Sequence, residues 1–479
     1  MCTGIMAIAL VLGVAGAGVA DDLEPGEPYV SWEDVYSAAG PANSGNAITV
    51  CPDGNVVVAA QMDTGSTDIH LLRYAPGGSR SILATYDGGS FESPQGVACD
   101  SSGKIHVGGY VVGSSMLVLR YPSAGGATEW EYVSQECLND TFVYGIGKAA
   151  DGQLYVTGQD YCQSRANMMV MKFSAAGATV WREEYGITGE LIEGRDIAVM
   201  PGGETYVAGV RTDVGSQAWA LLVKYDSAGG FSWSQTIGGG YDCYGQAVAA
   251  DASGNAYIVC DKRITVSTME YEIRKYGPDG TLAWSRTVQA YHAPQDLVVG
   301  FDGNLYYCAN WTTASYDEGY QVTKMDPSGN VLWTLRGKKS VAGKDDNVGR
   351  IAADRSGNVY LTGSTDDGKS VLVAKISIER VSPGEGDVSV ASNLLDLSAG
   401  YGEVVFYIKG NAGKEVVARF YALTGKYMGD VKVVLGADGQ GTARYSLEGV
   451  DGRKPGPGTY VAVFSGGGVK AKKAFVVKR

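Results

Sequence analysis

A turn-centred segment returns about every 50 residues through most of the chain, and it limits the possible folds more than any other feature of the sequence. In its clearest copy, Asp354–Gly363, Gly357 and Asn358 can take the positive φ angles of a tight turn, from which Val359–Leu361 runs back as a strand. The same turn occurs seven times, beginning at Cys51, Asp100, Ala150, Pro201, Asp251, Phe301 and Asp354. The repeat therefore predicts seven copies of one β-hairpin.

Each copy except the last is followed by a second hairpin. In it, a basic and an aromatic or similar residue precede a glycine turn and, in most copies, a tryptophan. The clearest examples are Lys172 to Trp181, Lys224 to Trp233, Lys275 to Trp284 and Lys324 to Trp333. One repeat is therefore four short antiparallel strands, named a to d, which is the size of a propeller blade. Because a blade cannot bury both of its faces alone, the blades must stack in a ring.

The two ends of the repeat region complement each other. The last copy lacks a tryptophan strand, and an unmatched tryptophan strand, Tyr29–Trp32, precedes the first copy. Pairing the two would complete the last blade and leave no open sheet edge between the first and last blades. The sequence thus predicts an all-β fold: a seven-bladed β-propeller over residues 29–378, closed by its N-terminal strand.

The segments on either side of the propeller have different compositions. Residues 1–20 form an apolar run of small residues ending at Ala20, as in a secretory signal peptide, and no later segment is typical of a transmembrane helix. Residues 379–394 have the composition of a linker. Short alternating strands separated by glycine-rich turns then predict a small β-sandwich over residues 395–479. We therefore expect a secreted protein of two β domains.

Two resemblances support this division. The repeats resemble the bacterial β-propeller repeats of secreted proteins, through the Asp-x-Ser-Gly-Asn-x-Tyr turn and the Gly-x-x-x-Trp hairpin. Residues 395–479 resemble the Ig-like domain of flagellar hook-capping proteins, which also serves as a C-terminal tail of secreted bacterial proteins. The matching residues are Leu447–Arg453, Pro457–Phe464, Gly466–Gly468 and Lys472–Lys473, although Leu447–Gly449 replaces the usual Trp-Asp-Gly. The second resemblance implies a spacer, sorting or surface-attachment module outside the cell.

Charge and cysteine content narrow the partners and the compartment. The net charge of −13 argues against a nucleic-acid partner, because no basic stripe is present to neutralise phosphates. Two disulfides are predicted for an exported chain, Cys137 with Cys162 and Cys243 with Cys260, with free buried thiols as the alternative. The three cysteines in or beside predicted strands are expected to be small core residues: Cys51, Cys99 and Cys308. The sequence does not specify an oligomeric state.

One face of the predicted propeller is the better candidate for binding. The a-to-b and c-to-d turns share one face and are short here, whereas the b-to-c and d-to-a loops share the other, which we call the variable face. Counting back about eight residues from each turn glycine gives the residue that begins each strand a on this face. These residues are Asn46, Gln95, Tyr144, Arg195, Gln246, Gln295 and Gly349, with Arg350 beside the last. They would form a polar floor for a ligand at the channel mouth, or hold only channel water and loop backbone.

Loops above this floor add Tyr244, His292 and Trp311, which could stack on and hydrogen-bond to a sugar or peptide. No histidine pair at metal spacing, no Gly-x-Ser-x-Gly and no complete calcium loop is present in the sequence, so we expect no metal or cofactor. The sequence favours a secreted or cell-surface binding protein for a glycan or another protein over an enzyme. The alternatives are a polysaccharide-active hydrolase or lyase with carboxylates on the variable face, and a purely structural surface protein.

Overall fold

The fold was analysed in a computed structural model. It describes residues 28–377 apart from 39, 112–114, 135–140, 149–151, 162–165, 266–268, 289–293, 313–317 and 338–344. It also describes residues 388–478 apart from 391–393, 397–402, 410–412, 423–426, 437–439, 447–457 and 467–468. The signal peptide predicted at residues 1–20 lies outside the described residues. The chain divides into two compact units, one of which spans Glu27–Ile378 while the other takes in the C-terminal residues from Glu379.

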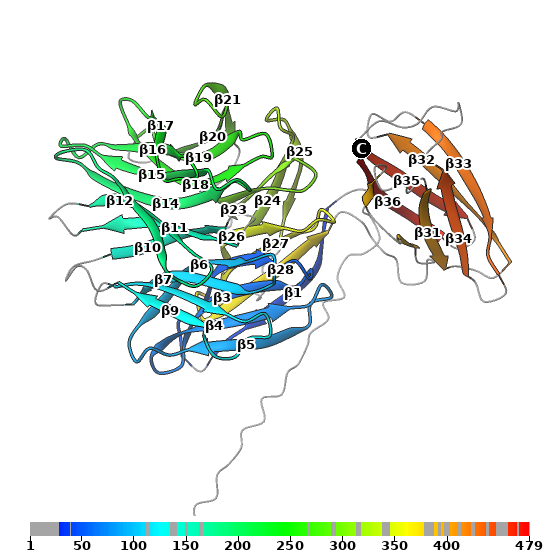
Figure 1. Cartoon of the computed structure of the whole chain (residues 1–479), viewed down its shortest axis with the longest axis horizontal. Coiled ribbons are helices and arrows are strands. Elements are labelled where there is room, and N and C mark those ends of the chain that lie inside the picture. The colour runs from blue at the N-terminus through cyan, green and yellow to red at the C-terminus, as the bar shows by residue number, and fades with distance from the viewer. Residues whose placement is uncertain are drawn as a thin grey trace, which may run out of the picture. The chain divides into compact units, whose positions relative to one another are not determined.

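The first unit consists of seven four-stranded antiparallel sheets, which confirms the predicted seven-bladed propeller (Figure 1). Blade 1 contains β2 (Ser44–Val50), β3 (Val56–Asp63), β4 (Thr67–Tyr74) and β5 (Arg80–Tyr86). Blade 2 contains β6 (Glu92–Cys99), β7 (Ile105–Val111), β8 (Ser115–Tyr121) and β9 (Trp130–Val133). Blade 3 contains β10 (Thr141–Lys148), β11 (Leu154–Asp160), β12 (Asn167–Phe173) and β13 (Thr179–Tyr185). Blade 4 contains β14 (Leu191–Val199), β15 (Thr205–Thr212), β16 (Ala218–Tyr225) and β17 (Phe231–Ile237). Blade 5 contains β18 (Asp242–Ala250), β19 (Ala256–Arg263), β20 (Met269–Tyr276) and β21 (Leu282–Val288). Blade 6 contains β22 (Pro294–Val299), β23 (Leu305–Thr312), β24 (Glu318–Met325) and β25 (Val331–Arg336). Blade 7 contains β26 (Asn347–Ala353), β27 (Val359–Thr365), β28 (Ser370–Ser377) and β1 (Tyr29–Tyr36).

The N-terminal strand closes the ring as predicted. Strand β1 pairs antiparallel with β28, and Trp32 lies opposite Lys375 in the register (Figure 1, dark blue beside yellow). The first strands of successive blades contact one another around the ring, with β26 of blade 7 meeting β2 of blade 1. These seven strands therefore surround the central channel.

Each pair of neighbouring blades shares one hydrophobic core. Between blades 7 and 1, for example, Val58, Leu72 and Tyr74 are buried with Tyr360 and Val371. Alternation along the strands explains this, because the side chains of one strand point alternately to the two faces of its sheet. A blade therefore packs against the preceding blade with one set of residues and against the following blade with the other.

The lysine and tryptophan of the repeat form a latch to the next blade. In blade 4, Lys224 Nζ and Trp233 Nε1 both donate hydrogen bonds to the carbonyl oxygen of Pro278 in blade 5, at 3.1 and 2.9 Å. The same Lys224 ammonium lies over the ring of Tyr206, 5.2 Å from its centroid, and the Tyr206 and Trp233 rings are 5.9 Å apart. The tryptophan also covers the turn glycine of the next blade, where a Cβ on Gly280 would lie 3.0 Å from the indole. These contacts explain the repeated lysine-to-tryptophan spacing.

The closing strand makes the same latch. Trp32 Nε1 and Lys375 Nζ each donate to the carbonyl oxygen of Pro76 at 3.1 Å, which ties blade 7 to blade 1. Gly78 is positioned under Trp32, where a Cβ would meet the indole at 3.0 Å. Its φ of 92° is one that glycine adopts without strain. The N-terminal strand therefore contributes the same interblade contacts as a strand d elsewhere in the ring.

The C-terminal unit contains a three-stranded and a five-stranded sheet. Its strands are β29 (Val388–Val390), β30 (Leu394–Asp396), β31 (Glu403–Lys409), β32 (Glu415–Ala422), β33 (Tyr427–Val434), β34 (Gln440–Ser446), β35 (Gly458–Gly466) and β36 (Val469–Lys478). Phe406 of the smaller sheet packs on Phe420 and Phe464 of the larger one, with ring centroids 5.8 and 5.1 Å apart. Strand β29 and the first residue of β30 lie in the segment that the sequence assigns to the linker. No helix that could cross a membrane occurs among the described residues.

The cysteines behave differently from the sequence-based expectation. Cys51 and Cys99 are buried in the core as expected, but a disulfide that was not predicted joins them. Cys51 follows β2 and Cys99 ends β6, so equivalent ends of two neighbouring blades are brought to a Cα–Cα distance of 5.2 Å. Cys243 and Cys260 are free and buried, which matches the alternative considered for this pair, and they share a hydrogen bond. Cys308 is free and buried in the core as expected, whereas Cys137 and Cys162 lie outside the described residues.

We expect Trp32→Ala to destabilise the propeller by about 2–4 kcal/mol, because the change removes a partly buried indole and one of the hydrogen bonds that join blade 7 to blade 1. Urea unfolding followed by circular dichroism would measure the loss. Trp311→Ala is the control, because Trp311 lies at the end of β23 and makes no interblade latch. Equal losses in the two variants would contradict the proposed importance of ring closure.

We expect reduction of the Cys51–Cys99 disulfide to cost up to about 4 kcal/mol, since the bond closes a sequence separation of 48 residues in the unfolded chain. Dithiothreitol should lower the melting temperature of the wild type and leave that of a Cys51→Ala, Cys99→Ala double variant unchanged. Peptide mapping under non-reducing conditions provides the direct check. A linked peptide containing Cys243 and Cys260 in place of Cys51 and Cys99 would refute the assignment.

Candidate functional site at the channel mouth

A β-bulge occurs in the first strand of every blade, and the bulged residue is in each case the one that the sequence analysis placed at the channel mouth. The register skips one residue between, for example, Gly194 and Asp196 of β14, which leaves Arg195 without a partner in the ladder. The seven bulged residues are Asn46, Gln95, Tyr144, Arg195, Gln246, Gln295 and Gly349. A bulge bends the strand and re-aims the side chain. Each repeat thus contains a bulge that changes the direction of one residue at the channel mouth.

Arg195 is the centre of a polar network between blades 4 and 5. Its Nε donates to Glu193 at 2.5 Å, and its Nη1 donates to the side-chain oxygen of the next bulged residue, Gln246, at 3.0 Å. Its guanidinium also lies 5.6 Å from the ring centroid of Tyr244, and Arg263 lies 5.8 Å from the same ring. Two cations therefore lie near one partly exposed aromatic ring.

Asp261 adds a carboxylate to this network. Burial raises the pKa of Asp261, whereas Arg263, Arg195 and a hydrogen bond from Gln246 act in the opposite direction. Blades 4 and 5 thus place two guanidinium groups, an amide, a phenol and two carboxylates at one side of the mouth. Such a set can donate to and accept from a polar ligand while Tyr244 offers a stacking surface.

The opposite side of the mouth is built from uncharged groups. In blades 1 and 2, Gln95 donates to Ser93 at 2.9 Å and Ser93 donates to Gln61 at 2.8 Å. Asn46 donates to the same Gln61 oxygen at 3.4 Å. Two bulged amides are therefore joined through Gln61, at the end of a second strand. This chain of hydrogen bonds fixes the side-chain orientations without introducing a charge.

An aromatic group lies between these two regions. Phe142 stacks on the bulged Tyr144 at 6.0 Å and meets Tyr110 of blade 2 edge-on at 5.2 Å. Burial raises the pKa of Tyr144, with a further contribution from Glu193 of the next blade, so its hydroxyl stays protonated and can donate a hydrogen bond. Blades 2 and 3 thus provide a second stacking surface at the mouth.

Three charged residues lie one position deeper in the channel. The residue after each bulge is small in most blades, but is Asp196 in blade 4, Asp296 in blade 6 and Arg350 in blade 7. Blades 4 and 7 are not neighbours, so the electrostatic interaction of Asp196 with Arg350 has to cross the channel. Asp296 interacts with both groups. We call these three residues the channel triad.

The two carboxylates of the channel triad also bridge blades. Asp196 Oδ2 accepts a hydrogen bond from the Val248 N–H of blade 5 at 2.8 Å, and Asp296 Oδ2 accepts one from the Ile351 N–H of blade 7 at 3.0 Å. Burial raises the pKa of both acids while Arg350 lowers it, and the pKa of Asp296 reaches about 7. A carboxyl group poised near neutrality can hold or release a proton at physiological pH.

The remaining sequence-predicted residues divide into three groups. Arg350 joins the channel triad, and Gln295 and Gly349 occupy bulges of blades 6 and 7. Trp311 is the next-to-last residue of β23, and the Arg336 guanidinium lies 4.6 Å from its ring centroid. His292 lies outside the described residues. The sequence analysis missed Asp196 and Asp296, although reading the next position of the same repeat would have shown two acids and an arginine among small residues.

Comparisons with known proteins found one matching family model and similar solved structures. The family described as Beta-propeller repeat matches residues 337–368, which lie in and before blade 7. A solved structure of streptogramin B lyase is similar at 12% sequence identity and a TM-score of 0.45, over 72% of this chain and 98% of that chain. Another similar structure is that of PorZ, an essential bacterial surface component of the type-IX secretion system of Porphyromonas gingivalis. That similarity has 14% identity and a TM-score of 0.42, and it covers 90% of this chain and 59% of PorZ. No curated protein matches the chain.

Proposed function

We propose that this chain is a secreted or cell-surface binding protein whose propeller recognises a glycan or another protein at the mouth of its central channel. The observation that carries the proposal is the bulge in every first strand. These seven bulges supply a ring of amides, a phenol and a guanidinium on a rigid scaffold. Hydroxyl-rich or peptide ligands are recognised by such mixtures of donors, acceptors and aromatic faces.

The side formed by blades 4 and 5 is the proposed main contact. Arg195 and Glu193 are partly exposed, with side-chain accessibilities of 29% and 26%, so both can exchange water for ligand. Their mutual hydrogen bond holds them in place before binding, which reduces the conformational entropy that a ligand must overcome. Tyr244 between two guanidinium groups would stack on a sugar ring or a peptide side chain.

The proposed location outside the cytoplasm rests on the predicted signal peptide and on the Cys51–Cys99 disulfide, since such bonds persist in oxidising compartments. In this proposal the C-terminal unit acts as the surface-attachment, sorting or spacer module that its Ig-like sequence resemblance implies. The propeller supplies recognition, and the C-terminal unit determines where that recognition takes place.

A second candidate is a polysaccharide-active hydrolase or lyase, and the channel triad is the observation that favours it. Asp196 and Asp296 are two interacting carboxylates with raised pKa values, and Arg350 supplies a positive charge beside them. A pair of acids with unequal proton affinity is the usual requirement of general acid–base chemistry on sugars. Against this reading, both acids accept backbone hydrogen bonds from neighbouring blades, which is a sufficient structural reason for their presence.

We expect a glycan and peptide array to identify a ligand of the full chain, and Arg195→Ala or Tyr244→Ala to weaken binding at least about tenfold. Arg355→Ala and Phe301→Ala are matched controls, because Arg355 lies 5.3 Å from the Phe301 ring centroid in a similar pair beside the a-to-b turns of the opposite face. Calorimetry with the identified ligand would measure each affinity. Equal losses in both pairs of variants, or no ligand at all, would count against recognition at the mouth and favour a structural role.

We expect Asp296→Asn to separate the binding and catalytic readings. Released products that disappear in Asp296→Asn, while ligand affinity is retained, would establish the enzyme reading. Binding without released product in the wild type would exclude it for that ligand. Arg350→Lys keeps the positive charge of the channel triad and serves as the milder variant if Asp296→Asn affects folding.

The raised pKa of Asp296 also predicts a pH dependence of stability. In the unfolded chain this carboxyl titrates near pH 3.9, and in the folded chain near 7, so folding favours its neutral form. Its stabilising contribution is present below about pH 4 and is lost as the pH rises to about 7. We therefore expect the melting temperature of Asp296→Asn to rise relative to the wild type across that interval.

Asp302→Asn provides the control for this pH series. Despite burial, hydrogen bonds from Lys324, Asn304 and Tyr306 hold the pKa of Asp302 below its ordinary value. Its contribution is therefore complete above about pH 4, and its difference from the wild type should stay constant between about pH 5 and 7. A constant difference for Asp296→Asn as well would show that Asp296 is ionised throughout this range.

A further inference from the structure

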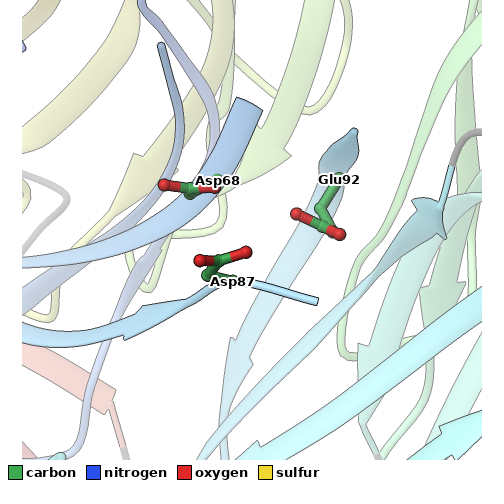
Figure 2. Close-up of side chains that lie close together, drawn as sticks. All are labelled: Asp68, Asp87 and Glu92. Atoms are coloured by element: carbon green, nitrogen blue, oxygen red, sulfur yellow. The ribbon is translucent and has the colours of Figure 1, made fainter. Parts of the chain in front are cut away.

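A second group of acids lies on the variable face, away from the channel triad in the fold. Asp68 lies near the start of β4, Asp87 follows β5, and Glu92 is the first residue of β6. Carboxylate oxygens of all three lie within 4.8 Å of one another. Figure 2 shows these side chains gathered from three separate segments: a strand of blade 1, the loop between blades 1 and 2, and a strand of blade 2. We call these residues the carboxylate cluster.

The most deeply buried member of the cluster has an unused ligand atom. Glu92 is fully buried, at 0% exposure, and its Oε2 has no hydrogen-bond partner among the described residues. Its other oxygen, Oε1, accepts from the Ser90 N–H at 3.1 Å. A buried carboxylate oxygen without a partner is costly, and it is found where an ion or water completes the site. Here the orphaned group belongs to a cluster of three acids.

Protein cations do not balance these charges. Within the described part of the chain, no lysine, arginine or histidine forms an ion pair with Asp68, Asp87 or Glu92. Among these residues, the charge that the three carboxylates carry when ionised is therefore not offset by a basic side chain.

Hydrogen bonds from the surrounding loops hold the acids in place. Ser66 donates to Asp68 Oδ1 at 2.8 Å, and Thr64 donates to its Oδ2. The Gly89 N–H donates to Asp87 Oδ1 at 2.8 Å. Each carboxylate is thus oriented by an outer group and keeps lone pairs for a further ligand, which is the arrangement expected around metal ligands.

We propose that Asp68, Asp87 and Glu92 bind one calcium ion. An all-oxygen set of carboxylates selects a hard cation, and two oxygens bound to the same Ca²⁺ at about 2.4 Å lie at most about 4.8 Å apart. Ligands from a strand start, a loop and a second strand start suit the flexible geometry of calcium better than the strict octahedron of magnesium. The site would be completed by water on the side of the exposed Asp87.

The ion would join blade 1 to blade 2. Asp87 belongs to the loop that connects the two blades, and Glu92 begins the first strand of blade 2. The same strand, β6, ends at Cys99, whose disulfide partner Cys51 belongs to blade 1. The two blades would therefore be tied by a disulfide at one face of the propeller and by calcium at the other.

Calorimetric titration of the full chain with CaCl₂, after treatment with EDTA, tests the proposal. We expect one site with a dissociation constant of about 0.1–1 mM, the range of extracellular calcium modules, and a saturable rise in melting temperature. Titration with MgCl₂ should give a smaller shift. Absence of calcium binding up to several millimolar, or a stronger response to magnesium, would overturn the assignment.

Two variants place the ion at the cluster. Asp87→Asn should weaken calcium binding at least about tenfold, and Glu92→Gln should abolish the thermal shift. We also expect Glu92→Gln to raise the melting temperature without metal, because it removes a buried charge repelled by two others, so a well-folded variant remains available. Asp53→Asn, an exposed acid of the opposite face of blade 1, is the control and should bind calcium like the wild type. Unchanged calcium binding in both cluster variants would refute the site.

Discussion

The propeller depends on the contact between the lysine and tryptophan of one blade and the c-to-d turn of the next. One carbonyl oxygen, such as that of Pro278, accepts hydrogen bonds from both side chains, while the indole covers the turn glycine. The tyrosine of strand b lies beneath both groups, so cation, ring and carbonyl are fixed together. Where both side chains make it, the contact links a blade to its successor, as in blades 4, 5 and 7. Trp32 extends this rule to the last blade, which is why a ring and not an open stack results.

The bulge in each first strand is the second constraint, and it determines what the mouth can do. A regular strand alternates its side chains between the two blade faces, where adjacent blades would bury them. A bulge interrupts the alternation and frees one residue per blade from the ladder. Each bulge leaves one residue of the strand without a partner in the ladder, and this is the same in all blades. The bulged residues themselves differ, from Asn46 with its amide to Arg195 with its guanidinium. Recognition and architecture are therefore specified by different positions of one repeat.

Blades 1 and 2 depart from the repeat in a related way. Cys51 occupies the turn position that holds the hydrogen-bonding aspartate in other copies, such as Asp251 and Asp354. In this copy Asp53 accepts the turn hydrogen bonds from Asn55 instead, and Cys51 adds a covalent link between blades. At the other end of β6, Glu92 takes a buried position without a matching base, which is the feature that motivates the calcium proposal. Both departures lie at the junction between blades 1 and 2.

The local sequence determined the number of blades, the closing strand and the bulged residues, because turn chemistry and strand alternation act within about ten residues of chain. It did not reveal contacts between blades. The disulfide joins Cys51 to Cys99, which sequence reasoning did not pair, because separation along the chain does not show which strand ends meet in the ring. Asp196, Asp296 and Arg350 are likewise unremarkable in their own repeats. Only the closed ring brings them across one channel, where burial raises the pKa of both acids and the charge of Arg350 lowers it.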